Sequence, residues 1–148
     1  MNKIYAFIIV IPMIVILFFK TIAFYEFDTK QRYVKNAIDN VAHKVMITGV
    51  LTVGDRVELK KELQKMADFK DEDIVLERGT IAPDGAVSLL DEYVPGSILD
   101  RGDIFSIYVQ SENQSSLSKM EGGSAGESRE LYYSAKAICR VEKVTWAE

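Results

Sequence analysis

The chain is short of the residues on which most enzyme and metal sites depend. Its 148 residues include one cysteine, Cys139, and one histidine, His43. A single cysteine excludes an intramolecular disulfide, and a lone histidine is a poor basis for a metal site. No G-x-x-x-x-G-K-[ST] or G-x-G-x-x-G motif occurs, so we expect no phosphate-binding loop. We therefore predict no metal, no cofactor and, without an evident set of acid, base and nucleophile, no enzymatic activity.

An excess of basic charge is also missing. The chain after Tyr25 carries 16 basic and 22 acidic residues, a net charge near −6. Nucleic-acid-binding domains are typically basic, so we do not expect a nucleic-acid partner. Cys139 and His43 could in principle form a nucleophilic pair, but nothing in the sequence places them close together. We expect structural roles for both, with Cys139 as a small core residue.

Charge is absent altogether from residues 4–19, and apolar residues resume after Lys20. As a helix, residues 4–25 are long enough to cross a hydrocarbon layer of about 30 Å. A cleaved signal peptide would need small residues at its cleavage site, whereas residues 20–28 contain bulky aromatics. We therefore expect a retained transmembrane segment at 1–25 and a head domain at 26–148. Pro12 is expected to bend this helix, which membrane helices tolerate.

The helical pattern continues beyond the apolar segment. Residues 27–48 contain neither Pro nor Gly. Four apolar residues recur there at spacings of 4, 3 and 4, which places them on one helical face: Val34, Ile38, Val41 and Val45. We expect this face to pack on a sheet. Gly49 is the first stop signal, so one helix over residues 3–48 would be about 69 Å long.

The remaining sequence predicts a short helix and a small sheet. Asp55 is expected to cap the helix, with Glu58 completing a capping-box-like pair, and Phe69 should close it against the core. Strands are expected within 73–78, 86–93, 103–110 and 129–144, from their β-forming composition and alternation. The last two should pair as an antiparallel hairpin around a serine- and glycine-rich flexible loop at 111–128. The segregation of helices from strands makes the fold class α+β.

Aromatic residues gather near the end of the apolar segment. They are Phe18, Phe19, Phe24, Tyr25, Phe27 and Tyr33. They fit an aromatic belt at a membrane interface, and they fit equally well packing between the helices of neighbouring subunits. The sequence leaves both interpretations open.

The layout resembles type IV pilin-like proteins, and within them the small Tad-pilus-associated (TadE-like) membrane-anchored proteins. The segments 33–40 and 45–49, reading YVKNAIDN and VMITG, carry this resemblance, together with the long helix that is apolar and then amphipathic. It implies a non-enzymatic, single-pass subunit or minor component of a type IV or Tad-like pilus. Such a subunit would assemble through its N-terminal helix with copies of itself or with other pilin-like subunits.

The resemblance also implies which residues meet lipid or neighbouring helices, and where the head lies. The residues are Ile8, Ile11, Pro12, Val15, Phe18, Phe19, Phe24 and Tyr25. The head would be extracellular, and in an assembled pilus it would lie on a surface filament. Lys20, Lys30, Arg32 and Lys35 on the head side of the segment outnumber Lys3 on the other side, which favours a cytoplasmic head by the positive-inside rule. The alternative is a membrane-tethered accessory or sensor-like module of a secretion or conjugation apparatus that does not polymerise.

Overall fold

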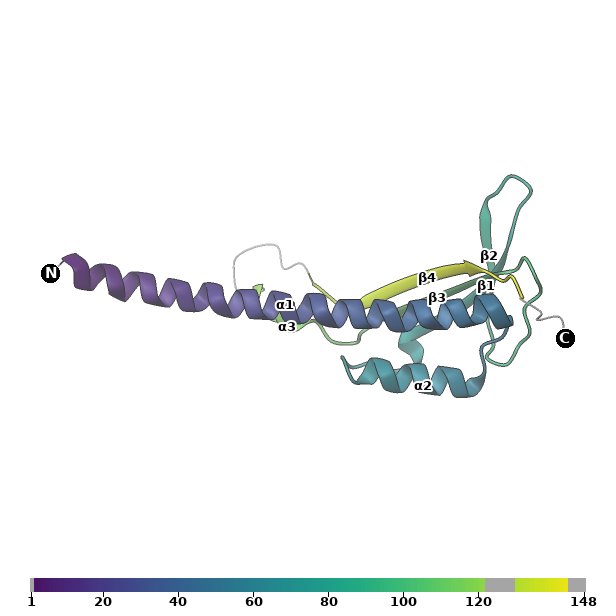
Figure 1. Ribbon diagram of the computed structural model, residues 1–148, viewed down its shortest axis with the longest axis horizontal. Coiled ribbons are helices and arrows are strands. Elements are labelled where there is room, and N and C mark those ends of the chain that lie inside the picture. Colours follow the sequence, from purple (N-terminus) through teal and green to yellow (C-terminus); the bar gives the residue numbers. More distant parts are fainter. Residues whose placement is uncertain (1, 122–129, 144–148) are drawn as a thin grey trace.

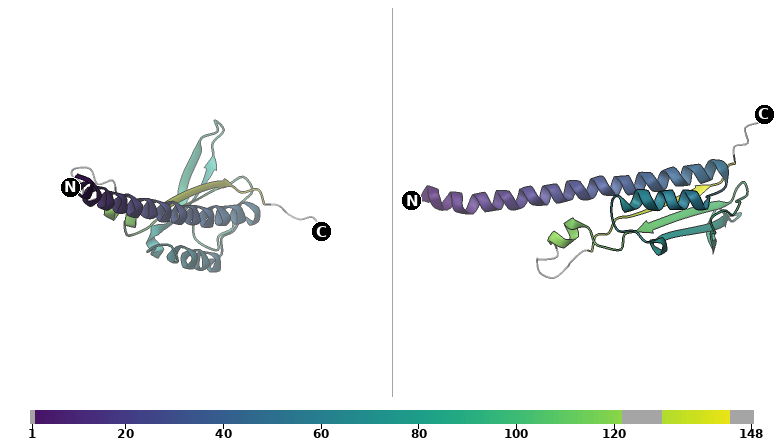
Figure 2. Two further views of the ribbon diagram at one scale, coloured as in Figure 1. Left: turned by 60° about the vertical axis from the view of Figure 1, so that its left-hand side comes forward. Right: turned by 90° about the horizontal axis from the view of Figure 1, so that it is seen from below.

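The computed structural model describes residues 2–121 and 130–143. A single long helix runs the length of the molecule, and a small α+β head lies against its C-terminal half (Figure 1). The N-terminal half extends away from the head with no other described element beside most of its length (Figures 1 and 2). The fold class expected from the sequence is therefore confirmed.

The element order places the helices before the sheet, apart from one short helix late in the chain. The helices are α1 (Asn2–Thr48), α2 (Val53–Gln64) and α3 (Ser116–Glu121), with a 3-10 turn at Asp71–Asp73. The strands are β1 (Ile74–Ile81), β2 (Val87–Glu92), β3 (Ile104–Gln110) and β4 (Ser134–Arg140). They form one four-stranded sheet in the order β2-β1-β3-β4. All neighbouring strands are antiparallel.

Helix α1 is continuous through Pro12 and ends where the sequence predicts. Gly49 follows it with a φ of +74°, a left-handed conformation that glycine adopts without the steric cost of a Cβ. The Gly49 N–H donates to the Val45 carbonyl oxygen at 2.7 Å, which closes the last turn. Between the two halves, Lys30 pairs with Glu26 at 2.8 Å and Arg32 with Asp28 at 3.0 Å. Such i,i+4 pairs support an exposed helix.

The N-terminal cap of α2 differs from the expectation. The cap residue is Thr52, and Asp55 is the third residue of the helix, so Asp55 as the cap and Glu58 as its partner were wrong. The Thr52 hydroxyl accepts from the Asp55 N–H at 3.1 Å, and the Asp55 carboxylate accepts from the Thr52 N–H at 3.1 Å. This is a complete capping box, shifted by one turn because Thr52 has the extended backbone that a cap requires.

The sheet has the pairing that the sequence predicts between its last two strands. β3 and β4 pair antiparallel, with Phe105 opposite Cys139 and Ile107 opposite Ala137. β1 pairs with β3 on one side and with β2 on the other, and a register shift lies between Arg78 and Gly79. A Cβ on Gly79 would lie 2.0 Å from the Ser88 carbonyl oxygen. Glycine is therefore required at this register shift, where the β2 backbone approaches β1 closely.

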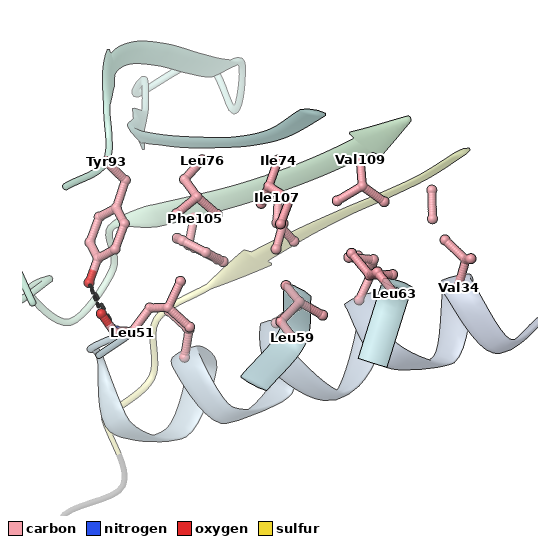
Figure 3. Close-up of a cluster of buried hydrophobic side chains, with 14 of the residues drawn as sticks. Val34, Leu51, Leu59, Leu63, Ile74, Leu76, Tyr93, Phe105, Ile107 and Val109 are labelled. Atoms are coloured by element: carbon pink, nitrogen blue, oxygen red, sulfur yellow. Dashed lines mark hydrogen bonds between the residues drawn. The ribbon is translucent and has the colours of Figure 1, made fainter. Parts of the chain in front are cut away.

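One hydrophobic core lies between the sheet and the two helices α1 and α2 (Figure 3). Leu59 and Leu63 of α2 and Phe69 after it contribute from one side, and Ile74, Leu76, Phe105, Ile107 and Val109 contribute from the sheet. Tyr93 is also buried, with its ring edge-on to Phe105 at a centroid distance of 5.3 Å. Phe69 therefore lies in the core, as expected.

Two expectations for the C-terminal third need correction. The segment 111–128 was expected to be a flexible loop, but α3 forms within it, and Ser115, Leu117 and Ser118 are buried. The sequence did not reveal this helix because its apolar content is low. Leu117 is the one large apolar side chain that α3 buries. The last strand spans Ser134–Arg140, shorter than 129–144. Residues 122–129 and 144–148 lie outside the described residues.

Candidate functional site: the two halves of helix α1

The N-terminal half of α1 has the composition of a membrane span. Its large apolar side chains from Ile4 to Phe24 are all exposed. All eight residues predicted for membrane contact or assembly lie on this exposed surface: Ile8, Ile11, Pro12, Val15, Phe18, Phe19, Phe24 and Tyr25. This is the one helix among the described residues that is long and apolar enough to cross a membrane, with a mean hydropathy of 2.7 over its best window. So large an apolar surface is unfavourable in water and requires an apolar partner.

The polar groups within this half differ in how well they are satisfied. The Thr21 hydroxyl donates to the Leu17 carbonyl oxygen at 2.8 Å, so it is compatible with an apolar environment. Lys20 is exposed, and its long apolar stem lets the ammonium group reach the membrane surface from a position near the end of a span. Lys20 therefore suits the boundary of a span better than its centre.

The C-terminal half of α1 packs on the head. Val34, Ile38 and Val45 have exposed fractions of 0 % and belong to the main core cluster. Val41 is only partly buried and packs at the edge of this cluster, while Ala42 takes a buried position beside it. By the helical period, Val41 and Ala42 lie at equal angles on opposite sides of the line through Ile38 and Val45, so periodicity alone does not tell which of the two is buried.

Phe27 marks the junction between the two halves. The Phe27 ring stacks on the Tyr133 ring at a centroid distance of 5.3 Å, and the Lys30 ammonium group lies 5.9 Å from the centroid of the Tyr133 ring. Burial raises the pKa of the Tyr133 hydroxyl above its usual value. Phe27 is thus part of the folded head, unlike the other aromatic residues of the predicted belt, which are exposed. The sequence indicated the aromatic cluster but gave no sign of Tyr133 as a partner.

The structure gives Cys139 a partner other than His43. The Cys139 thiol donates to the Ala42 carbonyl oxygen at 3.2 Å. Burial raises the pKa of this thiol to about 11, whereas a nucleophilic cysteine needs a lowered pKa. His43 follows Ala42 in the chain, but its side chain is exposed. Within residues 2–121 and 130–143, no group of three His, Cys, Asp or Glu side chains could hold a metal ion.

The acidic cluster at Asp71, Glu72 and Asp73 forms a 3-10 turn at the surface. Asp71 pairs with Lys60 at 2.8 Å, which lowers the pKa of that carboxyl group. The Asp73 carboxylate accepts from the Lys70 N–H at 2.7 Å. These contacts are those of a capped turn that begins β1, and they give the cluster a structural role.

Comparisons of the chain with protein-family models, with curated proteins and with solved structures find no match. The features that bear on function are therefore those of the molecule itself. They are an exposed apolar half-helix, a head that packs on the other half of the same helix, and the junction between them.

Proposed function

We propose that this protein is a non-enzymatic, single-pass membrane protein whose α+β head is carried on the C-terminal half of its anchoring helix. The observation that supports this most directly is the continuity of α1 over 47 residues. Its exposed apolar half and its core-packed half share one rigid element, so the head cannot swivel freely on a linker. A pilin-like subunit needs such an arrangement, because helix packing then fixes the position of every head in a filament.

In this proposal the protein is a subunit or minor component of a type IV or Tad-like pilus. The apolar half of α1 lies in the bilayer before assembly and packs afterwards against copies of itself or other pilin-like subunits. The head lies outside the cell. The exposed aromatic residues Phe18, Phe19, Phe24 and Tyr25 provide large rigid surfaces for helix packing.

A second candidate function is favoured by Lys20. Packing in a filament core would bury its ammonium group, and an unpaired buried charge is costly. At a membrane surface the same group stays hydrated. This observation fits a membrane-tethered accessory or sensor-like module of a secretion or conjugation apparatus that does not polymerise.

Shearing of intact cells that make the full chain separates the two candidates. Recovery of the protein in the sheared filament fraction would support the pilin-like function. Recovery only in detergent-extracted membranes would support the tethered module and refute polymerisation. Recovery in the soluble fraction without detergent would refute both. Protease cleavage at the exposed hairpin turn around Gly85 in intact cells tests the orientation, and protection there would contradict an extracellular head.

A charge variant tests whether the apolar half of α1 is what holds the protein in the membrane or filament fraction. Ile11→Arg places a charge near the middle of the exposed apolar surface, where insertion into a bilayer costs about 2.5–3.5 kcal/mol. We expect this variant to leave the membrane or filament fraction. The matched control is Ile98→Arg, which changes another exposed isoleucine, in the head beyond the C-terminal end of α1, and should leave fractionation unchanged.

A further inference from the structure

Helix α3 is the described part of the head nearest the N-terminal half of α1 (Figures 1 and 2). It packs against α1. Ala23 of α1 and Leu117 of α3 are both buried, and neither belongs to the main core cluster. The contact between α1 and α3 therefore lies apart from the main core. Ala23 lies three residues after Lys20.

This contact is held rigidly to the rest of the head. The Ser115 N–H donates to the Leu131 carbonyl oxygen at 2.8 Å, and the Leu131 N–H donates to the Ser118 hydroxyl at 3.1 Å. Two residues further on, Tyr133 stacks on Phe27 of α1. The hydrogen bonds to Leu131 and the stacking of Tyr133 on Phe27 therefore fix the position of α3 along α1.

The position of α3 limits how far a bilayer can extend along α1. Residues 4–22 form a helical segment of about 28 Å, close to the hydrocarbon thickness of about 30 Å. If the hydrocarbon continued to Tyr25, α3 would lie within it. α3 exposes Ser116 and Lys119, and a charged side chain exposed to acyl chains at that depth is costly. The hydrocarbon region must therefore end near Ile22.

We propose that α3 rests on the headgroup region of the same bilayer that α1 crosses and holds the head against the membrane surface. Met120 is 46 % exposed, although α3 is otherwise polar on its solvent side. Beside it, Lys119 is exposed and can reach lipid phosphates. An apolar side chain flanked by a cation is suited to the boundary between headgroups and acyl chains. The occupant of this surface is lipid because the adjoining surface of α1 is the membrane span; the inference rests on the proposed membrane anchoring.

Depth-dependent quenching of a fluorophore tests the contact in the full chain. The background is Cys139→Ala, so that a single cysteine can be labelled with an environment-sensitive dye at Met120→Cys, Ile98→Cys or Ile11→Cys. Each labelled protein is reconstituted into vesicles of phosphatidylcholine and phosphatidylglycerol that contain lipids with a nitroxide near the headgroup or deep in the acyl chain.

The expected pattern separates this inference from the proposed function. The shallow nitroxide should quench the label at 120 at least about three-fold more than the label at 98, if α3 sits in the interface. Position 98 is the matched control, because Ile98 is 72 % exposed and pairs with Val50 beyond the C-terminal end of α1. Equal quenching at 120 and 98 would overturn the contact of α3 with lipid. Absence of deep quenching at position 11 would instead overturn the membrane anchoring itself.

Discussion

The side-chain amide of Gln31 in α1 pairs with the backbone of Ser134 in β4 through both of its ends. The Ser134 N–H donates to Gln31 Oε1 at 3.2 Å, and Gln31 Nε2 donates to the Ser134 carbonyl oxygen. The two residues are 103 positions apart in the sequence. Since β4 is an edge strand of the sheet, Gln31 satisfies backbone groups that would otherwise be open to a further strand.

Gln31→Glu should destabilise the head while changing its shape very little. The glutamate keeps an acceptor for the Ser134 N–H but places a carboxylate oxygen against the Ser134 carbonyl oxygen. Loss of one partner of a part-buried hydrogen bond costs about 1–3 kcal/mol. The measurement is urea unfolding of the full chain in detergent micelles, followed by circular dichroism. Asn36→Asp adds the same charge on the exposed face of α1 and should cost far less; equal losses would show that charge, not this pairing, is responsible.

Asp55 should make the stability of the head depend on pH. Its carboxylate accepts from Lys44 at 2.6 Å, and this bond, together with those to Thr52, lowers the pKa of the carboxyl group. Because the folded pKa lies below the unfolded value of about 4, the stabilisation is complete above that value and is lost as pH falls through the folded pKa. Asp55→Ala should cost about 0.5–2 kcal/mol at pH 7, as for a lost helix cap.

The same variant should come closer to the wild type in stability as the pH is lowered below about 4. Parallel urea titrations at pH 7 and pH 3 measure this difference. Glu58→Ala, at an exposed position of the same helix, provides the control for a general effect of charge removal. A loss for Asp55→Ala that is the same at both pH values would contradict the role of the ionised carboxylate.

Cys139 should react slowly with thiol reagents while the head is folded. Burial raises the pKa of its thiol from the usual 9.0 to about 11. Only the thiolate reacts, so at pH 8 the folded protein should alkylate about 100-fold more slowly than the unfolded chain. Iodoacetamide labelling with and without urea, quantified by mass spectrometry, measures the ratio. Comparable rates in the two states would show that the contact between Cys139 and Ala42 opens readily.

Two glycines should respond to alanine in opposite directions. Gly79→Ala would place a Cβ 2.0 Å from the Ser88 carbonyl oxygen, so β1 and β2 would have to separate, and we expect a loss of at least about 1–3 kcal/mol. Gly54, at the start of α2, has ordinary space for a Cβ, with Thr52 Oγ1 at 3.7 Å. There alanine should stabilise by about 0.4–1 kcal/mol through the unfolded state. Thermal unfolding of both variants tests these two expectations. Tolerance of Gly79→Ala would contradict the close approach of the β2 backbone to Gly79.

Local signals account for the parts of the fold that the sequence predicted well. The uninterrupted helical pattern up to Gly49 and the alternation of side chains within Ser134–Arg140 depend on periodicity within one element. The N-cap of α2 was misplaced because Thr52, Asp55 and Glu58 all have side chains that suit a capping box, and only the backbone at Thr52 selects among them. Helix α3 was missed because its contact with α1 is made between segments far apart in the chain.

By itself, the sequence determined that the chain has one long helix, apolar and then amphipathic, and an α+β head, because hydrophobic periods and turn residues act locally. The tertiary structure decided where the head begins. Ala23 is buried, Phe27 is stacked on Tyr133, Gln31 is bonded to Ser134, and α3 packs on α1. These contacts join residues about a hundred positions apart, and no periodicity encodes them. They form only when β4 is brought alongside α1 by its pairing with β3, and they end the free apolar half of α1 near Ile22.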